Sequence, residues 1–278
     1  MDSGGEMNTV NMRDKQQTIA NASIIAIDSI TTNKYLIVYT DNCDLNIYKN
    51  NQILFFPQGS FVFIERGIKF SCKIKKINSD TKPYRAIRLD KEELIMLKEI
   101  LKSTHRYYFD EKIIEIKPRK KIVRGEGYPD YVWIFNRIAY TNDRTLKILK
   151  LAYIISRMGI AKDIIHSLIA SAAITFTDKV RSMVEKDTSK KWRINMIADK
   201  FNISEISVRK RLEAEGMSFN NLLVEVRMNK AMQLLLENEQ QIHQISKAIG
   251  ILSPSYFIKS FKNHFGITPK QFIIYFRE

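Results

Sequence analysis

The chain has 278 residues, a formal net charge of +15 and a pI near 9.6. A chain of this length is expected to form two domains, and its charge favours a polyanionic partner, either nucleic acid or an anionic membrane surface. No apolar run is long enough to cross a bilayer, and residues 1–20, expected to be disordered, contain no signal-peptide core, so a cytoplasmic protein is expected.

Residues 21–176 are expected to form the first domain, which begins with short β-rich segments. Turn residues separate these segments, and several short strands at regular spacing predict a small barrel or double sheet. The five predicted strands are Tyr35–Tyr39, Leu45–Tyr48, Ile53–Phe56, Ser60–Ile64 and Phe70–Ile74. The two cysteines, Cys43 and Cys72, are expected to be reduced, half-buried thiols, with a disulfide or redox switch as the alternative.

Helical periodicity follows the strands. Residues 91–101 predict a helix, whereas residues 107–140 hold a basic cluster, glycines and a proline and predict an irregular segment. Helices are predicted again at 144–158 and 163–176. They form either a homodimer interface, over residues 144–176, or a cover for the barrel, and the pattern does not choose between these two roles.

Residues 177–278 contain an internal repeat. Residues 197–203 and 245–251 each end a short helix at a residue that tolerates a left-handed backbone, Asn202 or Gly250. A helix-capping serine follows in each copy, Ser204 or Ser253. This pattern predicts two helix-turn-helix units, at 193–213 and 242–265. A long helix over 219–237 would join them and hold the recognition helices roughly 34 Å apart, one turn of DNA.

Helical phase predicts which side chains of the two units face outward. If Val208 and Leu212, and likewise Phe257 and Phe261, point into the core, the opposite side is exposed. Cationic side chains there can donate to guanine edges, and isoleucine can contact a thymine methyl. The alternative is that these are ordinary solvated residues. The predicted DNA-binding residues are Ile206, Arg209, Lys210, Ser255, Ile258, Lys259 and Lys262, with Arg227 as a phosphate contact.

The second unit and the joining helix resemble the AraC family of transcriptional regulators over about the last hundred residues. The matching residues are Arg227, Ala231, Leu234, Leu235, Ile245, Gly250, Ser255, Tyr256, Phe257, Phe261, Lys262, Phe265, Gly266, Thr268, Pro269 and Phe272. The chain departs from the family pattern in having Ile251 where phenylalanine is usual and Ser246 where alanine is common.

Further segments resemble the Rns, VirF and ToxT group of enteric virulence activators, which includes RegA-type regulators. They include residues 180–187, 204–213 and 63–67. The resemblance implies an α+β protein with an N-terminal cupin-like β-barrel, dimerisation helices and a C-terminal all-α domain. It also implies activation of virulence or colonisation genes at AT-rich double-stranded promoter DNA, with RNA polymerase as a partner. Group members respond to a small anion, either bicarbonate or a fatty acid.

The expected effector site follows from the same resemblance. Arg88 matches a basic residue that holds the carboxylate of a fatty acid, whereas Asn33 stands where a near relative has histidine, a change that leaves a smaller anion open. Lys34, Tyr35 and Lys210 are further candidate polar groups of the pocket, and an ordinary surface ion pair is the alternative for Arg88. Only His105 lies near the predicted barrel, so neither a metal site nor another cofactor is expected.

The sequence also bears on two other classes of function. An enzyme finds no support, because the sequence contains no phosphate loop, nucleophile motif or paired histidine and carboxylate signature. A basic nucleoid-type or membrane-surface protein would use charge without sequence preference, and equal affinity for promoter and scrambled DNA would favour it.

Overall fold

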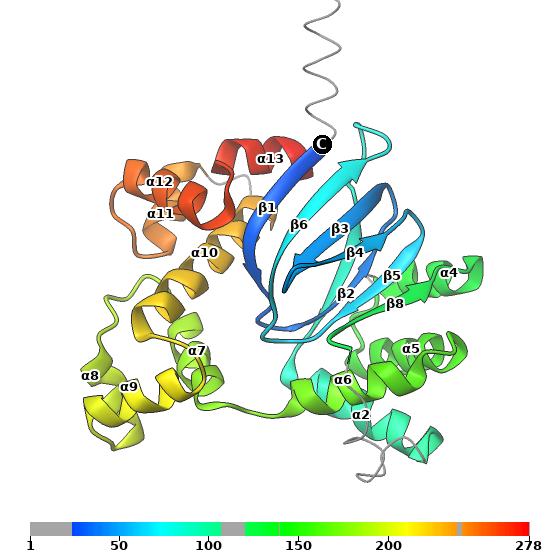
Figure 1. Ribbon diagram of the computed structural model, residues 1–278, viewed down its shortest axis with the longest axis horizontal. Coiled ribbons are helices and arrows are strands. Elements are labelled where there is room, and N and C mark those ends of the chain that lie inside the picture. Colours follow the sequence, from blue (N-terminus) through cyan, green and yellow to red (C-terminus); the bar gives the residue numbers. More distant parts are fainter. Residues whose placement is uncertain (1–23, 107–119, 139, 238–240, 278) are drawn as a thin grey trace, which may run out of the picture. The chain divides into compact units, whose positions relative to one another are not determined.

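The computed structural model describes residues 24–106, 120–138, 140–237 and 241–277 (Figure 1). The chain divides into two compact units, one made of residues 1–168 with 274–278 and the other of residues 169–273. Each unit has its own hydrophobic core, and each is described by itself.

Two four-stranded antiparallel sheets form the centre of the first unit (Figure 1). Sheet A has the order β1-β6-β3-β4, with β1 at Ile24–Thr31, β6 at Lys69–Lys76, β3 at Cys43–Lys49 and β4 at Gln52–Phe56. Sheet B has the order β7-β2-β5-β8, with β7 at Arg85–Leu89, β2 at Tyr35–Tyr39, β5 at Ser60–Ile64 and β8 at Ile122–Glu126. The five predicted strands are confirmed as β2 to β6. The arrangement is a cupin-like sandwich rather than a closed barrel.

Residue alternation sets the inner face of sheet A. One row across the sheet consists of Ile25, Ile74, Leu45 and Phe56, and all four are buried. The β3–β4 hairpin is closed by Asn50 and Asn51, both with positive φ (48° and 60°), as a type I′ turn requires. Sequence reasoning missed β1 and β7 because polar residues interrupt their apolar pattern.

Sheet B is more enclosed than sheet A. Every residue of β5 is buried, and a Cβ added at Gly125 of β8 would lie 2.9 Å from side-chain atoms of Met158 and Ile160. The helices of this unit are α2 (Lys91–Thr104), α4 (Pro129–Ile138), α5 (Arg144–Arg157) and most of α6 (Ala161–Ala172). Because Met158 and Ile160 come directly after α5, the outer side of sheet B is packed by the chain that follows this helix.

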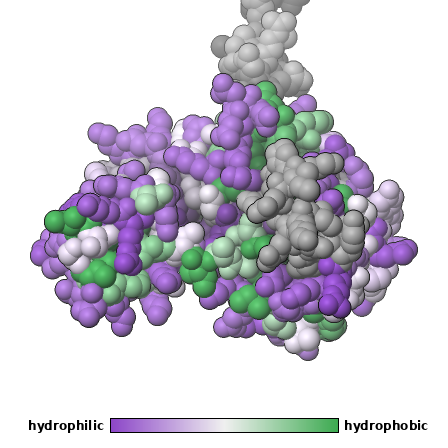
Figure 2. All heavy atoms as spheres, turned by 60° about the horizontal axis from the view of Figure 1, so that its bottom comes forward, coloured by the Kyte–Doolittle hydropathy of each residue, from purple (hydrophilic) through white to green (hydrophobic). Residues whose placement is uncertain are grey.

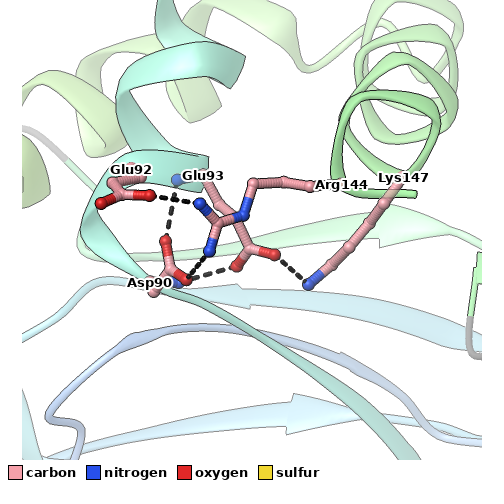
Figure 3. A network of polar contacts seen from close by, with 5 residues as sticks. All are labelled: Asp90, Glu92, Glu93, Arg144 and Lys147. Carbon is pink, nitrogen blue, oxygen red and sulfur yellow. Dashed lines mark hydrogen bonds and ion pairs between the residues drawn. The ribbon is translucent and has the colours of Figure 1, made fainter. Parts of the chain in front are cut away.

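An ion-pair network joins the start of α2 to the start of α5 (Figure 3). Lys147 Nζ lies 2.5 Å from Glu93 Oε1, and the Arg144 guanidinium contacts both Asp90 and Glu92. Asp90 also caps α2, where its side chain accepts from the Glu93 amide at 2.9 Å. One side of α5 is thus held by α2, which directs the opposite side of α5 away from it.

Two sequence predictions are wrong. Residues 107–140 were expected to be irregular, but β8 and α4 lie within this range; residues 107–119, like the N-terminal residues 1–20, lie outside the described residues. Glycine in β8 hid the strand signal. The single helix expected over 163–176 is also wrong, because α6 ends at Ala172 and Thr175 caps a new helix, α7 (Phe176–Lys186).

The second unit is helical. After α7 come α8 (Ile194–Phe201), α9 (Glu205–Ala214), α10 (Phe219–Glu237), α11 (Ile242–Ala248), α12 (Pro254–Phe265) and α13 (Pro269–Arg277). Its first core gathers buried apolar residues of α7 to α10, such as Val184, Ile197, Val208 and Leu222.

Both cysteines are free and buried, and burial raises the pKa of each thiol to about 12. At neutral pH the two thiols are therefore protonated and weakly nucleophilic. They are free, as expected, but buried rather than half-buried.

Candidate nucleic-acid interface

The first helix-turn-helix unit consists of α8, a tight turn and α9. The α8 helix ends at Asn202, which adopts a left-handed backbone (φ 54°, ψ 45°). Ser204 then begins α9, and its hydroxyl accepts from the Ser207 amide at 3.2 Å. Val208 and Leu212 are fully buried in the first core. Their burial sets the rotation of α9 and leaves its other side in solvent.

The second helix-turn-helix unit repeats this plan with α11 and α12. Ser253 caps α12, accepting from the Tyr256 amide at 3.3 Å, and Pro254 occupies the first turn. Three phenylalanines of α12, namely Phe257, Phe261 and Phe265, are fully buried, and the rings of Phe261 and Phe265 lie 4.7 Å apart between centroids. The aromatic core sets the rotation of α12 in the same way as Val208 and Leu212 set that of α9.

Gly250 makes the second turn possible for two reasons. Its φ is +73°, a conformation that other residues adopt at a cost. A Cβ there would also lie 2.6 Å from the carbonyl oxygen of Ser189 and 2.9 Å from Nη2 of Arg227. Glycine is therefore required by backbone conformation and by close approach together.

The predicted outward orientation is confirmed for both recognition helices. Ile206 is 66% exposed and Ile258 is 39% exposed. The remaining members of the predicted faces, Arg209, Lys210, Ser255, Lys259 and Lys262, are also exposed. The free side of α9 thus carries Ile206 and Lys210, and the free side of α12 carries Ile258 and Lys259.

The charge on these faces is positive. Helix α12 contains Lys259 and Lys262 and no acidic residue. On α9, Arg209 Nη2 lies 3.8 Å from Glu205 Oε2, a long solvent-exposed pair that contributes little, and Lys210 has no ion-pair partner among the described residues. Exposed cations beside apolar side chains suit the phosphates and base edges of DNA.

Arg227 lies in a different setting from the recognition helices. It is half-buried on α10, where Nε donates to the Thr188 carbonyl (3.3 Å) and Nη2 donates to the Lys190 carbonyl (3.1 Å). Burial lowers its pKa. The Thr188 hydroxyl in turn donates to the Ala248 carbonyl at 3.0 Å. Arg227 therefore holds the loop before α8 against the second helix-turn-helix unit. Its predicted phosphate contact stays a prediction.

Helix α10 joins the two helix-turn-helix units over the residues predicted for it, and its 19 residues span about 28 Å. Leu222 and Val226 belong to the first core, and Leu235 is also fully buried further along the helix. Arg181 of α7 pairs with Glu225 of α10 at 2.5 Å, and both side chains are nearly buried. These contacts make α10 a rigid connection between the two recognition helices.

Two apolar residues near α12 were not predicted. Leu252, in the turn, is 91% exposed, and Tyr256, at the start of the helix, is exposed as well. A leucine directly before a helix cap falls outside the core periodicity, and that irregularity is the signal that could have identified it. Figure 2 shows one face of the molecule, on which such apolar side chains form small groups among hydrophilic ones.

The predicted effector residues lie at the start of β2 and on β7, apart from Lys210. Arg88 is exposed and pairs across the sheet with Leu36, the neighbour of Tyr35. Tyr35 therefore points to the opposite face of sheet B from Arg88; it is fully buried, and its hydroxyl accepts from Ser167 Oγ at 3.2 Å. Burial raises the Tyr35 pKa. Asn33 and Lys34 occupy the turn before β2.

A groove of about 240 Å³ lies elsewhere in the first unit, between α4 and α5. Its lining residues are Trp133, Ile134, Arg137, Leu149, Lys150 and Tyr153. None of the predicted effector residues lines it. Over the ranges that the structure describes, no three histidine, cysteine or acidic side chains are grouped as a metal site would need, and no helix is long and apolar enough to span a membrane.

Two helix-turn-helix units with matching exposed faces, joined by one rigid helix, define a protein built to bind duplex DNA. Residues 197–273 match the model of a helix-turn-helix domain family. The chain is 43% identical to the HTH-type transcriptional activator CsvR of Escherichia coli, covering 91% of this chain and 96% of that protein. It is 34% identical to the virulence regulon transcriptional activator VirF of Shigella flexneri, covering 90% and 95%.

A solved structure shows the same fold. ToxT from Vibrio cholerae matches with a TM-score of 0.66 and 15% sequence identity, over 92% of this chain and 95% of that one. The chain belongs to the AraC family of transcriptional activators.

Proposed function

We propose that this protein is a sequence-specific activator of virulence genes that binds AT-rich promoter DNA through α9 and α12 in successive major grooves. The observation that carries the proposal is the pair of exposed faces: each contains an isoleucine, and Lys210 and Lys259 occupy equivalent positions on the two helices. Exposed isoleucines are costly in water and suit the methyl groups of thymine, which favours AT-rich sites. The relatives named as activators, VirF among them, support the same reading.

The test starts from selection of duplexes out of a random pool by the full-length protein. Lys210→Ala and Lys259→Ala should each weaken binding to the selected site by about 1–3 kcal/mol. Lys186→Ala, an exposed lysine of α7, is the matched control and should bind normally. Normal binding by both recognition-helix variants, with folding intact, would remove the groove assignment. Equal affinity for selected and scrambled duplexes would instead support the nonspecific nucleoid-type alternative.

We propose that Arg88 of β7 and the turn before β2 supply the anion site. Arg88 is exposed and has no ion-pair partner among the described residues, so its charge is available to bicarbonate or a fatty-acid carboxylate. One solved ToxT structure is of the unsaturated fatty acid bound protein, which supports an anionic effector of this kind. Calorimetry with each anion, on wild type and Arg88→Ala, tests this site. Equal binding by the two proteins would exclude Arg88 from the anion site.

Helix α5 supplies the proposed homodimer surface within residues 144–176. Its outward side carries Leu146, Leu149 and Tyr153, all exposed, and Trp133 of α4 extends this surface. No residue of α6 is fully exposed, so α5 is the better candidate of the two helices. Leu149→Glu should convert a dimer to a monomer in sedimentation velocity, whereas Leu252→Glu, an exposed leucine near α12, should not. An unchanged sedimentation coefficient for Leu149→Glu would rule out this surface.

At the promoter, the protein would act in the cytoplasm and recruit RNA polymerase. In transcription with purified polymerase on the selected site, wild type should raise transcript yield, and Lys210→Ala should not.

A further inference from the structure

The outer face of sheet A carries side chains that sheet packing does not use. Antiparallel partners project to the same side of a sheet, so the register defines rows across this face. One row contains Lys73, Asn46 and Phe55, and the next contains Ser71, Tyr48 and Ile53. A third row places Lys75 between Ile24 and Asp44.

This face is open to solvent. Phe55 is 53% exposed, Ile53 is 64% exposed and Tyr48 is 38% exposed, while the inward residues Leu45, Ile47 and Phe56 of the same strands are buried. Strand β4 is the edge of the sheet. Sheet B is enclosed on its outer side by later parts of the chain, whereas the outer side of sheet A presents two aromatic rings directly to water.

The charge on the face is positive. Lys69, Lys73 and Lys75 all project outward from β6, are exposed, and have no ion-pair partner among the residues that the structure describes. Lys73 and Lys75 are two residues apart, which on an antiparallel strand is about 6.8 Å. Two carboxylates lie on this face: Asp44, whose Oδ1 accepts from the Gln58 amide at 3.1 Å, and the exposed Asp28 of β1. Neither forms an ion pair with the three lysines among the described residues. The lysines are therefore left to attract an external anion.

We propose that this face of sheet A binds single-stranded nucleic acid. Bases stack on exposed aromatic rings of a sheet, and a lysine row beside the rings follows the phosphates of an extended strand. Tyr48 and Phe55 would supply the stacking surfaces, and the β6 lysines would contact phosphates. Asn46, which lies between Lys73 and Phe55 in its row, would donate to or accept from a base edge. The proposal concerns a surface separate from α9 and α12 and does not rest on the function proposed for them.

Two other occupants fit the face less well. A second copy of the chain would bring the same lysine row against itself, and like charges placed opposite each other are destabilising. An anionic membrane would attract the lysines, but the aromatic rings lie within the sheet beside charged side chains rather than on a protruding apolar loop. A single strand uses the rings and the lysines together.

The experiment uses the full-length protein saturated with its selected duplex, so that the recognition helices are occupied. A labelled oligothymidine or oligouridine of about 12 nucleotides is then titrated by fluorescence anisotropy. We expect Phe55→Thr and Tyr48→Thr each to raise the Kd about fivefold or more. Phe55→Tyr and Tyr48→Phe keep a ring and should bind like wild type. The oligomer with the lower Kd identifies open promoter DNA or transcript as the source of the strand.

Lys73→Ala should lower the slope of log K against log salt by about 0.7, as the loss of one single-strand phosphate contact does. Tyr140→Thr and Lys102→Ala, an exposed aromatic residue and an exposed lysine elsewhere in the same unit, are controls that should leave binding unchanged. Unchanged binding by the threonine variants would overturn the proposal. It would also be overturned if those variants lost only self-association, or only binding to phosphatidylserine vesicles, while the oligomers still bound.

Discussion

Nη2 of Arg227 lies 2.9 Å from the point that a Cβ on Gly250 would occupy. The arginine comes from α10, and the glycine follows the first helix of the second helix-turn-helix unit. The loop before the first helix-turn-helix unit contacts both of them, through Ser189 at the glycine and Lys190 at the arginine. This junction is where both helix-turn-helix units meet the joining helix. Changes here are therefore expected to affect the two units together.

Gly250→Ala should destabilise the DNA-binding unit. The added methyl group meets the Ser189 carbonyl oxygen at 2.6 Å and also has to accept a positive φ. The φ alone costs about 1–2 kcal/mol, and the overlap adds to it. Gly216→Ala is the matched control, because Gly216 has φ +72° with nothing within 4 Å of its added Cβ. Urea unfolding followed by Trp192 fluorescence, in a Trp133→Phe background, measures the free energy of unfolding of both variants. Equal losses of stability would mean that the close approach at Gly250 is relieved at no cost.

Arg227→Gln distinguishes a phosphate contact from a residue that holds the loop. If Arg227 mainly donates to the Thr188 and Lys190 carbonyls, the free energy of unfolding should fall by about 1–3 kcal/mol. The slope of log K against log salt should then stay unchanged. A drop in slope of about 0.9, with stability retained, would show instead that Arg227 contacts a DNA phosphate.

The exposed isoleucines predict a response to thymine methyl groups. Replacing thymine by deoxyuracil throughout the selected site removes these methyls and should weaken wild-type binding by about 0.8 kcal/mol for each methyl that is buried. Ile206→Ala should reduce this penalty, because the apolar partner of the methyl is gone. The measurement is a double-mutant cycle by anisotropy. An equal uracil penalty in wild type, Ile206→Ala and Ile258→Ala would show that neither isoleucine contacts a thymine methyl.

Glu215 predicts a pH dependence of stability. Partial burial raises the pKa of its carboxyl, but the Thr177 side chain and the amides of Phe176 and Thr177 outweigh burial, so the pKa is lower than usual. A lowered folded-state pKa stabilises the fold above the unfolded pKa, near 4.3, and this contribution is lost as the pH falls through the folded pKa.

Glu215→Gln should therefore lower the free energy of unfolding at pH 7 by about 1 kcal/mol and make little difference well below pH 4. Glu213→Gln, an exposed residue of α9, is the control and should change stability little at either pH. A Glu215→Gln effect that persisted undiminished below pH 4 would argue against a charged cap of α7.

Much of the DNA-binding unit could be predicted because its signals are local. The side chains of Val208 and Leu212, four residues apart, lie on one side of any α-helix, so their burial also determines the exposure of Ile206 and Lys210. The bounds of α10 and the left-handed positions at Asn202 and Gly250 follow from the same short-range rules. These rules need no knowledge of distant residues.

Other features depended on contacts between residues far apart in the chain. From the sequence alone Arg227 is indistinguishable from a solvated cation, because its two carbonyl partners lie some forty residues earlier in the chain. Strand β8 was missed because its glycine carries no apolar signal, and its position is set by pairing with β5. The lysine and aromatic rows of sheet A exist only once four strands are in register. The sequence by itself therefore determined the helices of the DNA-binding unit after α7, their phase and the family. The hydrogen-bond partners and the composition of each surface were decided by the tertiary structure, because these depend on which distant segments meet.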